Sequence, residues 1–406
     1  MYEWNDMELA IQEAVRQFVE AEIRPRREEF EFGDTPPYDV LRKLWKTFGI
    51  DAMAADALEK MLAKEKEGGA KASGSLTSGG GQGGMGAILI KELCRVSPGF
   101  VGCFGVSIGL TAATILSRGT LAQKERWLPS LVTLDKIGAW ALTEPGAGSD
   151  AFGSMKTYVK RDGVGYRLNG QKTFITNGPY ADTIVVYAKL SEDGVEDRDR
   201  KILTFVLDTG MEGLTQGKPF RKMGFHSSPT GELFFDNVYL EPDRLLGETE
   251  DHEGGDGRDS AKTGFVAERT GVAVMSLGII EECLELSTKY AKERVQFGRP
   301  ISDHQLIQLK LANMEIARVN VQNMVFRTLE MAAAGKQPSL AEASAMKVYS
   351  SQAATDCAMD AIQLFGGNGY MSEYPVEQLA RDAKSLMIYA GSNEVQITHV
   401  AKGLLA

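Results

Sequence analysis

Apolar residues recur at the spacing of an α-helix over the first third and the last part of the chain. The stripe that begins at Leu9 is ended by Pro25, and a second stripe is followed by Gly49. The last stripe ends at Gly366-Gly367, which is typical of a helix C-terminus. The spacing predicts helices over residues 9–23, 40–48, 88–131, 272–286, 306–329 and 340–365.

Between Ala139 and Leu246 the pattern changes to short apolar runs with two-residue alternation, which is typical of β-strands. The predicted strands are Tyr166–Leu168, Thr183–Tyr187, Ile202–Leu207 and Glu232–Phe235. Asn or Asp followed by Gly favours a tight turn. Such pairs are Asn169-Gly170, Asn177-Gly178 and Asp193-Gly194.

The order of these patterns predicts an α+β protein. We expect an all-α domain at residues 1–137, a β domain at 138–250 and a helical bundle at 251–406. Residues 68–86 are rich in Gly and Ser and predict a flexible loop; because they do not follow a predicted strand, a phosphate-binding loop is not supported. The charged, Gly-rich residues 248–258 predict a linker into the last domain.

Charge and composition narrow the classes of function. The 406 residues carry a net charge of -10, and so acidic a surface repels the phosphates of nucleic acid. No apolar run is identified as long enough for a membrane span, and the acidic start resembles no targeting segment, so a cytoplasmic protein is expected. The scattered cysteines and histidines predict reduced core thiols and no metal site.

Four segments carry a resemblance to one family. They read LTEPGAGSD (142–150), FITNG (174–178), ERVQFG (293–298) and QLFGGNGY (363–370). In this order and spacing, which span nearly the whole chain, the sequence resembles the acyl-CoA dehydrogenases. The resemblance implies a β-barrel between two helical domains, the second of them a four-helix bundle. It also implies a homotetramer that binds FAD between barrel and bundle, takes an acyl-CoA substrate and passes electrons to an electron-transferring flavoprotein.

The Thr143–Ser149 loop has backbone N–H groups that Pro145, Gly146 and Gly148 leave accessible, so it can donate hydrogen bonds to a flavin. By composition alone, a plain tight turn is the alternative. The resemblance assigns flavin contacts to Trp140, Leu142, Thr143, Ser149, Phe174, Ile175, Thr176, Ser392 and Glu394. Contacts with the FAD of a neighbouring subunit, or along the Gly-rich strip beside it, are assigned to Arg294, Gln296, Phe297, His304, Gln305, Gln363, Phe365, Gly366 and Gly367.

Dehydrogenation of an acyl thioester needs a carboxylate that removes a proton from Cα, and hydrogen bonds to the carbonyl oxygen as charge builds there. Most relatives carry that base where this chain has Ala390, whose backbone N–H is still expected to bind the oxygen. Isovaleryl- and long-chain-type members place the base before an Arg, where this chain has Glu268-Arg269. The resemblance therefore assigns the base to Glu268. The alternative is a helix-surface glutamate paired with Arg269 or Lys262.

The same resemblance assigns substrate contacts to Phe100, Phe104, Ser149, Phe265, Arg269, Tyr389 and Gly391. Val101 stands where glutaryl-type members have Arg, which disfavours a glutaryl substrate. Gly102 and Gly105 remove side chains from the predicted acyl wall, so we expect a bulky, branched or aromatic acyl group. Tyr389 stands where isovaleryl enzymes have Gly, which argues against isovaleryl-CoA itself.

Two other functions stay open. One is a flavoenzyme of the same fold with different chemistry, such as a desulfinase, oxidase or monooxygenase, since some of these lack the usual base. The other is a non-catalytic subunit of a mixed tetramer, which predicts that the chain expressed alone retains no FAD. The near-complete set of FAD motifs makes the second the weaker alternative.

Overall fold

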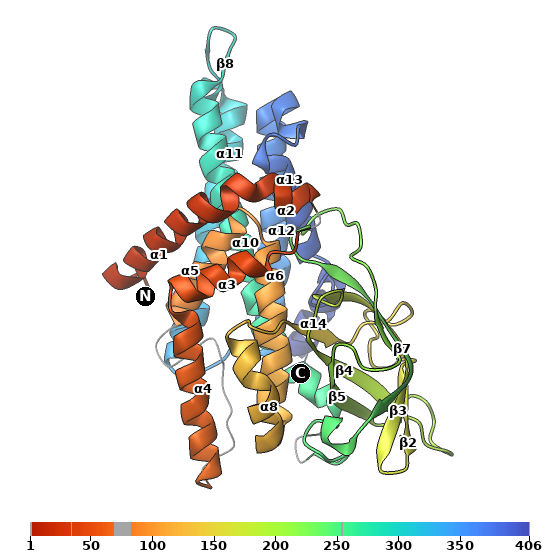
Figure 1. Cartoon of the computed structure of the whole chain (residues 1–406). Coiled ribbons are helices and arrows are strands. Elements are labelled where there is room, and N and C mark those ends of the chain that lie inside the picture. Colours follow the sequence, from red (N-terminus) through yellow and green to blue (C-terminus); the bar gives the residue numbers. More distant parts are fainter. Residues whose placement is uncertain (1, 34, 69–82, 253–254, 406) are drawn as a thin grey trace.

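The computed structural model describes residues 2–33, 35–68, 83–252 and 255–405. Helices form its N-terminal part, and the predicted helices at 9–23, 40–48 and 88–131 are confirmed in outline (Figure 1). They are α1 (Asp6–Phe18), η1 (Val19–Ile23), η2 (Arg24–Arg26), α2 (Arg27–Phe32), α3 (Tyr38–Thr47), α4 (Ile50–Lys66), α5 (Gly83–Cys94), α6 (Gly99–Phe104), η3 (Gly105–Ala112), α7 (Ala113–Arg118) and α8 (Leu121–Val132).

The loop predicted at residues 68–86 is wrong at its C-terminal end, because Gly83 begins helix α5. A side chain at Gly84 would overlap Glu8, which belongs to α1. Glycine therefore fits here because α1 packs closely against α5, and its low helix propensity is overridden by packing. The rest of the predicted loop, residues 69–82, lies outside the described residues.

Strands from residue 138 to residue 240 form one curled sheet, which lies to one side of the helices (Figure 1). The sheet has the order β1-β4-β2-β3-β7-β6, and β5 also pairs with β4. All the predicted strands are confirmed, within β3, β4, β5 and β7. The strands are β1 (Gly138–Ala141), β2 (Tyr158–Asp162), β3 (Gly165–Thr176), β4 (Thr183–Leu190), β5 (Ile202–Asp208), β6 (Leu214–Gln216) and β7 (Thr230–Leu240).

The turn predicted at Asn169-Gly170 is wrong, because both residues lie inside β3. The pairing of β3 with β7 shifts register between Leu168 and Gly170. A Cβ at Gly170 would lie 2.7 Å from Thr157 Cα, so the glycine marks a bulge and a close strand approach. The turns predicted at Asn177-Gly178 and Asp193-Gly194 are confirmed.

Helices resume after the sheet and confirm the predicted α+β class (Figure 1). Helix α10 packs against α11, α12 and α5, so it joins the last helices to the first ones. The C-terminal elements are α9 (Gly257–Thr263), α10 (Phe265–Glu293), β8 (Val295–Gln296), β9 (Arg299–Pro300), η5 (Ile301–Asp303), α11 (Gln305–Ala333), α12 (Leu340–Phe365), η6 (Gly366–Tyr370), α13 (Pro375–Leu386) and α14 (Asn393–Leu405).

The segment Gly99–Arg118 corrects one expectation from the sequence. Among the described residues it is long and apolar enough to cross a membrane by length and composition alone. Most of it is buried inside the protein, including Phe100, Ile108 and Ile115. It is therefore best explained as a core helix, which passes the same test of length and composition. The cysteines are buried and free, as expected for core thiols.

Candidate active site

The predicted flavin loop is anchored to the sheet by a buried ion pair. The Lys172 ammonium on β3 donates to the Glu144 carboxylate and to the Leu142 carbonyl, each at 2.9 Å. Glu144 also accepts from the backbone N–H groups of Lys156 and Thr157. Burial alone would raise the pKa of Glu144, but Lys172 and these N–H groups hold it below its usual value. The ion pair thus anchors the loop to the sheet.

Phe174 lies beside this loop in a strained backbone conformation. The Thr173 N–H donates to the Thr143 carbonyl, which joins β3 to the loop at 2.9 Å. The pairing of β3 with β7 breaks after Lys172, and Phe174 takes a φ of 56°, where few non-glycine residues are found. Its ring is 68% exposed although it is apolar. Strain and exposure together indicate a residue kept for binding rather than for stability.

The residues near Phe174 fit a flat aromatic cofactor. A Cβ at Gly146 or Gly148 would meet no atom within 4 Å, so the space over the loop backbone is open. The half-buried Thr143 and Thr176 offer hydroxyl groups near this space. Leu142 and Ile175 are buried in the core, so only their backbones remain for a ligand, and Trp140 Nε1 donates to the Tyr187 hydroxyl at 3.2 Å.

A second set of predicted cofactor residues lies on the β8–β9 hairpin. Figure 1 shows this hairpin at the end of α10 and α11, far from the strands of the sheet. Arg294 is exposed, Phe297 is 95% exposed, and the Phe297 ring meets His304 edge-on. Gln296 and Gln305 are exposed as well. The fold of one chain therefore does not bring this set to Phe174.

The predicted Gly-rich strip, residues 363–367, lies beside the residues of the hairpin. Phe365 stacks on Tyr290, with ring centroids 4.0 Å apart, and Tyr290 lies one turn before Arg294. Gly366 and Gly367 follow on the surface, and Gln363 is exposed beside them. Phe365 itself is buried, so its ring supports the strip and is not exposed to a ligand.

Glu268 lies in the first turn of α10 and is partly accessible. Among the described residues, no hydrogen bond or ion pair to its carboxylate is found. Burial raises the pKa of Glu268 to about 7, against the opposing effects of Arg269 and Lys347. The alternative of a pair with Arg269 is not supported, because the Arg269 guanidinium donates to Ser344 Oγ and lies over the Phe265 ring. The side chain of Lys262 lies outside the described residues.

The turn at Ala390-Gly391 is held by its carbonyl groups. Gln396 Nε2 donates to both carbonyls, at 2.9 Å and 3.0 Å, and Lys347 Nζ donates to that of Gly391 at 2.9 Å. Ala390 has a φ of 57°, another uncommon conformation for a non-glycine residue. No hydrogen bond from the Ala390 N–H to any described residue is found. Ser392 and Glu394 follow this turn.

The predicted acyl wall is closely packed at Phe100 and Phe104. Phe100 packs edge-on against Phe30, and the Phe104 ring lies tilted against Trp45. Both rings fill the helical core because they face the N-terminal helices. Their contact with substrate stays a prediction.

The two glycines of the wall also differ from each other. A Cβ at Gly102 would meet Ser228 Oγ at 3.0 Å and the Phe225 ring at 3.7 Å, so the expected volume there is already filled. A Cβ at Gly105 would meet nothing within 4 Å. Further along the same segment, Leu110 comes within 3.6 Å of a Cβ placed on Gly264, just before α10. Open space thus remains at Gly105, on a helix that runs toward the start of α10.

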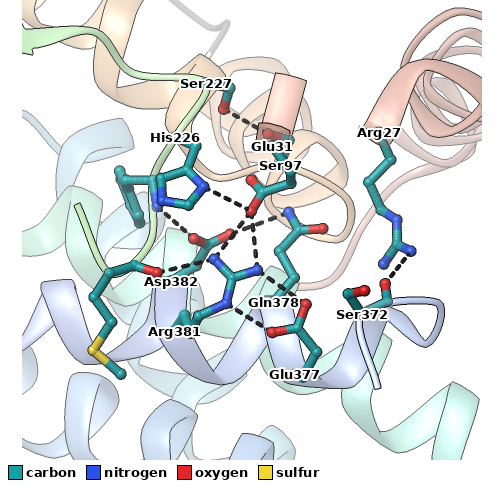
Figure 2. A network of polar contacts seen from close by, with 12 residues as sticks. Arg27, Glu31, Ser97, His226, Ser227, Ser372, Glu377, Gln378, Arg381 and Asp382 are labelled. Atoms are coloured by element: carbon teal, nitrogen blue, oxygen red, sulfur yellow. Dashed lines mark hydrogen bonds and ion pairs between the residues drawn. The ribbon is translucent and has the colours of Figure 1, made fainter. Parts of the chain in front are cut away.

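A polar network holds the loop that fills the Gly102 space (Figure 2). Glu31 of α2 accepts from Arg381 of α13 at 3.1 Å and meets His226 at 3.3 Å. The Asp382 carboxylate accepts from the Phe225 N–H at 2.5 Å. The Phe225 ring then lies edge-on to Tyr389, at 5.9 Å between centroids. The network thus fixes an aromatic contact directly behind the Tyr389-Ala390 turn.

Sequence patterns missed several residues that shape these sites. Lys172, Lys347 and Gln396 lie inside β3, α12 and α14, and no motif of the sequence singles them out. The sequence did contain one signal for Lys347. It is the one charged residue in ASAMKVYSS (343–351), whereas a helix face exposed to solvent would carry more charge. Phe225 follows Gly224 in an irregular segment that no periodicity describes.

Comparison with known proteins identifies the family. Residues 5–135, 139–238 and 255–405 match the N-terminal, middle and C-terminal domains of acyl-CoA dehydrogenase, in that order. An acyl-CoA dehydrogenase of Bacillus subtilis (strain 168) is 36% identical over 98% of both chains. The chain belongs to the acyl-CoA dehydrogenase family, whose members are oxidoreductases that act on the CH–CH group of acyl-CoA.

Solved structures agree with the family. Butyryl-CoA dehydrogenase from Megasphaera elsdenii superposes with a TM-score of 0.83 and 33% identity, covering 100% of both chains. A glutaryl-CoA dehydrogenase from Mycobacterium smegmatis, solved in complex with FADH2, has a TM-score of 0.79 and 26% identity, covering 98% of this chain and 95% of that one. The family is flavin-dependent.

Proposed function

We propose that the chain is an FAD-dependent acyl-CoA dehydrogenase that forms a 2-enoyl-CoA, with Glu268 as the catalytic base. One observation carries the proposal: Glu268 is a partly accessible carboxylate with no ion-pair partner among the described residues. Its electrostatic neighbours include Tyr389, next to the Ala390 turn, and Lys347, which bonds that turn. A free base and a free N–H donor thus lie in one region.

The residues of the site have separate roles in the proposed reaction. Glu268 removes the Cα proton, and a pKa of about 7 makes it a stronger base than a surface glutamate. The Ala390 N–H donates to the thioester carbonyl oxygen, where negative charge builds as the proton leaves. FAD, held by the Thr143–Ser149 loop and Phe174, would accept the hydride from Cβ.

The separation of the two cofactor sets supports a site shared between chains. The loop, Phe174 and Glu268 would come from one subunit, while Arg294, Phe297 and Gly366-Gly367 would come from its neighbour. The exposed Phe297 ring is an unusual feature for a free surface and suits a contact between subunits. By resemblance, the assembly would be a homotetramer and the electron acceptor an electron-transferring flavoprotein.

The deciding experiment is Glu268→Gln, with bleaching of bound flavin by a panel of acyl-CoA esters as the measurement. We expect a loss of at least 1000-fold in the bleaching rate with FAD still bound, since one proton-transfer group is removed. Glu281→Gln, about three and a half turns further along α10, is the matched control and keeps its rate. Retained bleaching in Glu268→Gln would overturn the assignment.

A second-site variant strengthens that test. In the double variant Glu268→Ala/Ala390→Glu, the carboxylate stands at the position that most relatives use. From there it should reach the same Cα of the acyl substrate. We expect bleaching to recover above that of Glu268→Gln. Enoyl-CoA formation with an artificial acceptor supports the dehydrogenase, whereas hydrogen peroxide formed with O2 favours an oxidase. Loss of FAD on purification of the chain alone would favour a non-catalytic subunit.

A further inference from the structure

Lys347 is a fully buried lysine in the first third of α12. Its Nζ donates to the Gly391 carbonyl at 2.9 Å and to Asn393 Oδ1 at 2.8 Å. Ser351, one turn further along α12, also bonds the Asn393 side chain. A buried ammonium costs free energy unless it is well bonded, so its place here needs a reason. The hydrogen bonds tie it to the turn that presents the Ala390 N–H.

The same lysine faces the proposed base. Arg269, next to Glu268, donates to Ser344 of α12, which fixes how the start of α10 lies on α12. Ser344 and Lys347 are three residues apart on a helix, so they share one face. Among the charged groups near Lys347, Glu268 has the largest effect on the pKa of Lys347, which it raises. Lys347 is thus bonded to the turn that contains Ala390 and lies within electrostatic reach of the Glu268 carboxylate.

Charged and titratable groups near Lys347 come from several elements. Glu268 and Arg269 of α10 and Glu394 of α14 act on Lys347 directly. Tyr389 of the turn lies near Glu268, His399 of α14 near Arg269, and Lys384 of α13 near Glu394. Burial lowers the pKa of Lys347 to about 8, while Glu268 and Glu394 act to raise it. Lys347 and Glu268 thus favour each other's charged form. Arg269 lowers the pKa of Glu268 more than Lys347 does, but its guanidinium donates to Ser344, and among the described residues no bond from it to the Ala390-Gly391 turn is found.

We propose that Lys347 is a positioning residue for the reaction: its ammonium fixes the Ala390-Gly391 turn and keeps the Glu268 carboxylate ionised near neutral pH. The inference rests on the proposed function of Glu268. The two effects have separate signatures. Loss of the charge moves the pH at which Glu268 becomes active, whereas loss of the tether lowers the rate at every pH.

The charge and the tether can be separated with two variants. Lys347→Gln keeps a hydrogen-bond donor without the charge, and Lys347→Met removes both. Lys124→Met is the matched control, because Lys124 is equally buried but pairs with Glu65 in the N-terminal helices. Should Lys347→Met fail to fold, Lys347→Gln alone still tests the charge.

The measurement is exchange of the Cα hydrogens of (ethylthio)acetyl-CoA with D2O, followed by mass spectrometry across a pH series. Sulfur replaces Cβ in this thioester, so no hydride can leave and exchange reports proton abstraction alone. In both Lys347 variants we expect the midpoint to rise by about 1 pH unit, because a nearby opposite charge no longer favours the carboxylate. Lys347→Gln should reach the wild-type plateau above the midpoint, and Lys347→Met should not.

Unchanged midpoints in both folded variants would overturn the inference, as would the same shift in Lys124→Met. Failure of the base assignment looks different. If Glu268→Gln exchanges as fast as the wild type, Glu268 is not the base, whatever the Lys347 variants do. If Glu268→Gln is inactive while the Lys347 variants keep the wild-type profile, the base assignment stands and the role of Lys347 falls.

Discussion

At the scale of single residues, Glu268 differs from other glutamates of α10 in the charged partners around its carboxylate. Glu282 is also buried, but Arg24 and Arg95 pair with it. Glu281 pairs with Lys91. For Glu268 no such partner is found among the described residues, so its carboxylate is left for chemistry. A buried acid that keeps a partner supports the fold, and one without a partner is a candidate for function.

The pH dependence of the free enzyme follows from this environment. Burial raises the pKa of Glu268 to about 7, and only the ionised form can take a proton. We therefore expect kcat/KM for a good acyl-CoA substrate to rise with pH through about 7 and then to level off. Stopped-flow bleaching of flavin across a pH series checks this. A profile that is flat between about pH 6 and 8 would contradict it.

Gly105 and Gly102 should respond differently to the same kind of substitution. Gly105→Leu enters open space, so it should leave stability intact but reduce kcat/KM for 3-phenylpropanoyl-CoA by about 10-fold or more relative to butyryl-CoA. Gly102→Ala meets Ser228 and Phe225, so it should cost about 1–3 kcal/mol of unfolding free energy. Substrate kinetics and chemical denaturation measure the two effects. Equal selectivity in wild type and Gly105→Leu would remove Gly105 from the acyl pocket.

At the scale of elements, β3 carries both the flavin-facing residues and their support. Lys172→Met would leave Glu144 buried and unpaired, which costs about 3–5 kcal/mol of unfolding free energy. The loop should then bind FAD less tightly, so less flavin should remain after purification. The control is Lys60→Met, since the exposed Lys60–Asp56 pair is worth less than about 1 kcal/mol. Equal losses in both variants would show that Lys172 does not support the loop.

Most elements could be predicted from the sequence because burial sets where their apolar residues lie. The helices at 272–286 and 340–365 carry apolar residues at helical spacing. The strands at 183–187 and 202–207 are nearly continuous apolar runs, because both of their faces are buried. The prediction failed at Asn169-Gly170, because a bulge and a hairpin turn both favour glycine. For Phe100 and Phe104, periodicity shows that a face is buried but not whether a cavity or a core lies there. Lys347 was missed because its partners are far away in the sequence.

At the scale of the whole molecule, the fold keeps the parts of the proposed cofactor site apart. The Thr143 loop and Phe174 lie on the sheet, while Arg294 and Phe297 lie on the hairpin at the other end of α10 (Figure 1). Helix α10 has 29 residues, so at 1.5 Å a residue it separates Glu268 near its start from the hairpin by roughly 40 Å. One chain cannot close that distance without breaking the helix. Two chains packed side by side can, if the hairpin of each reaches the sheet of the other.

This arrangement predicts complementation between two inactive variants. Glu268→Gln disables the part supplied by one chain, and Arg294→Glu the part supplied by its neighbour. When the two are co-expressed, each mixed pair holds one site with both defects and one intact site, so random pairing should restore about a quarter of wild-type activity. Glu268→Gln with Glu268→Ala is the control and should restore none, because both defects fall in the part that a chain supplies to its own site. If the first mixture is also inactive although its chains co-purify, each chain builds its site alone and the hairpin serves another purpose.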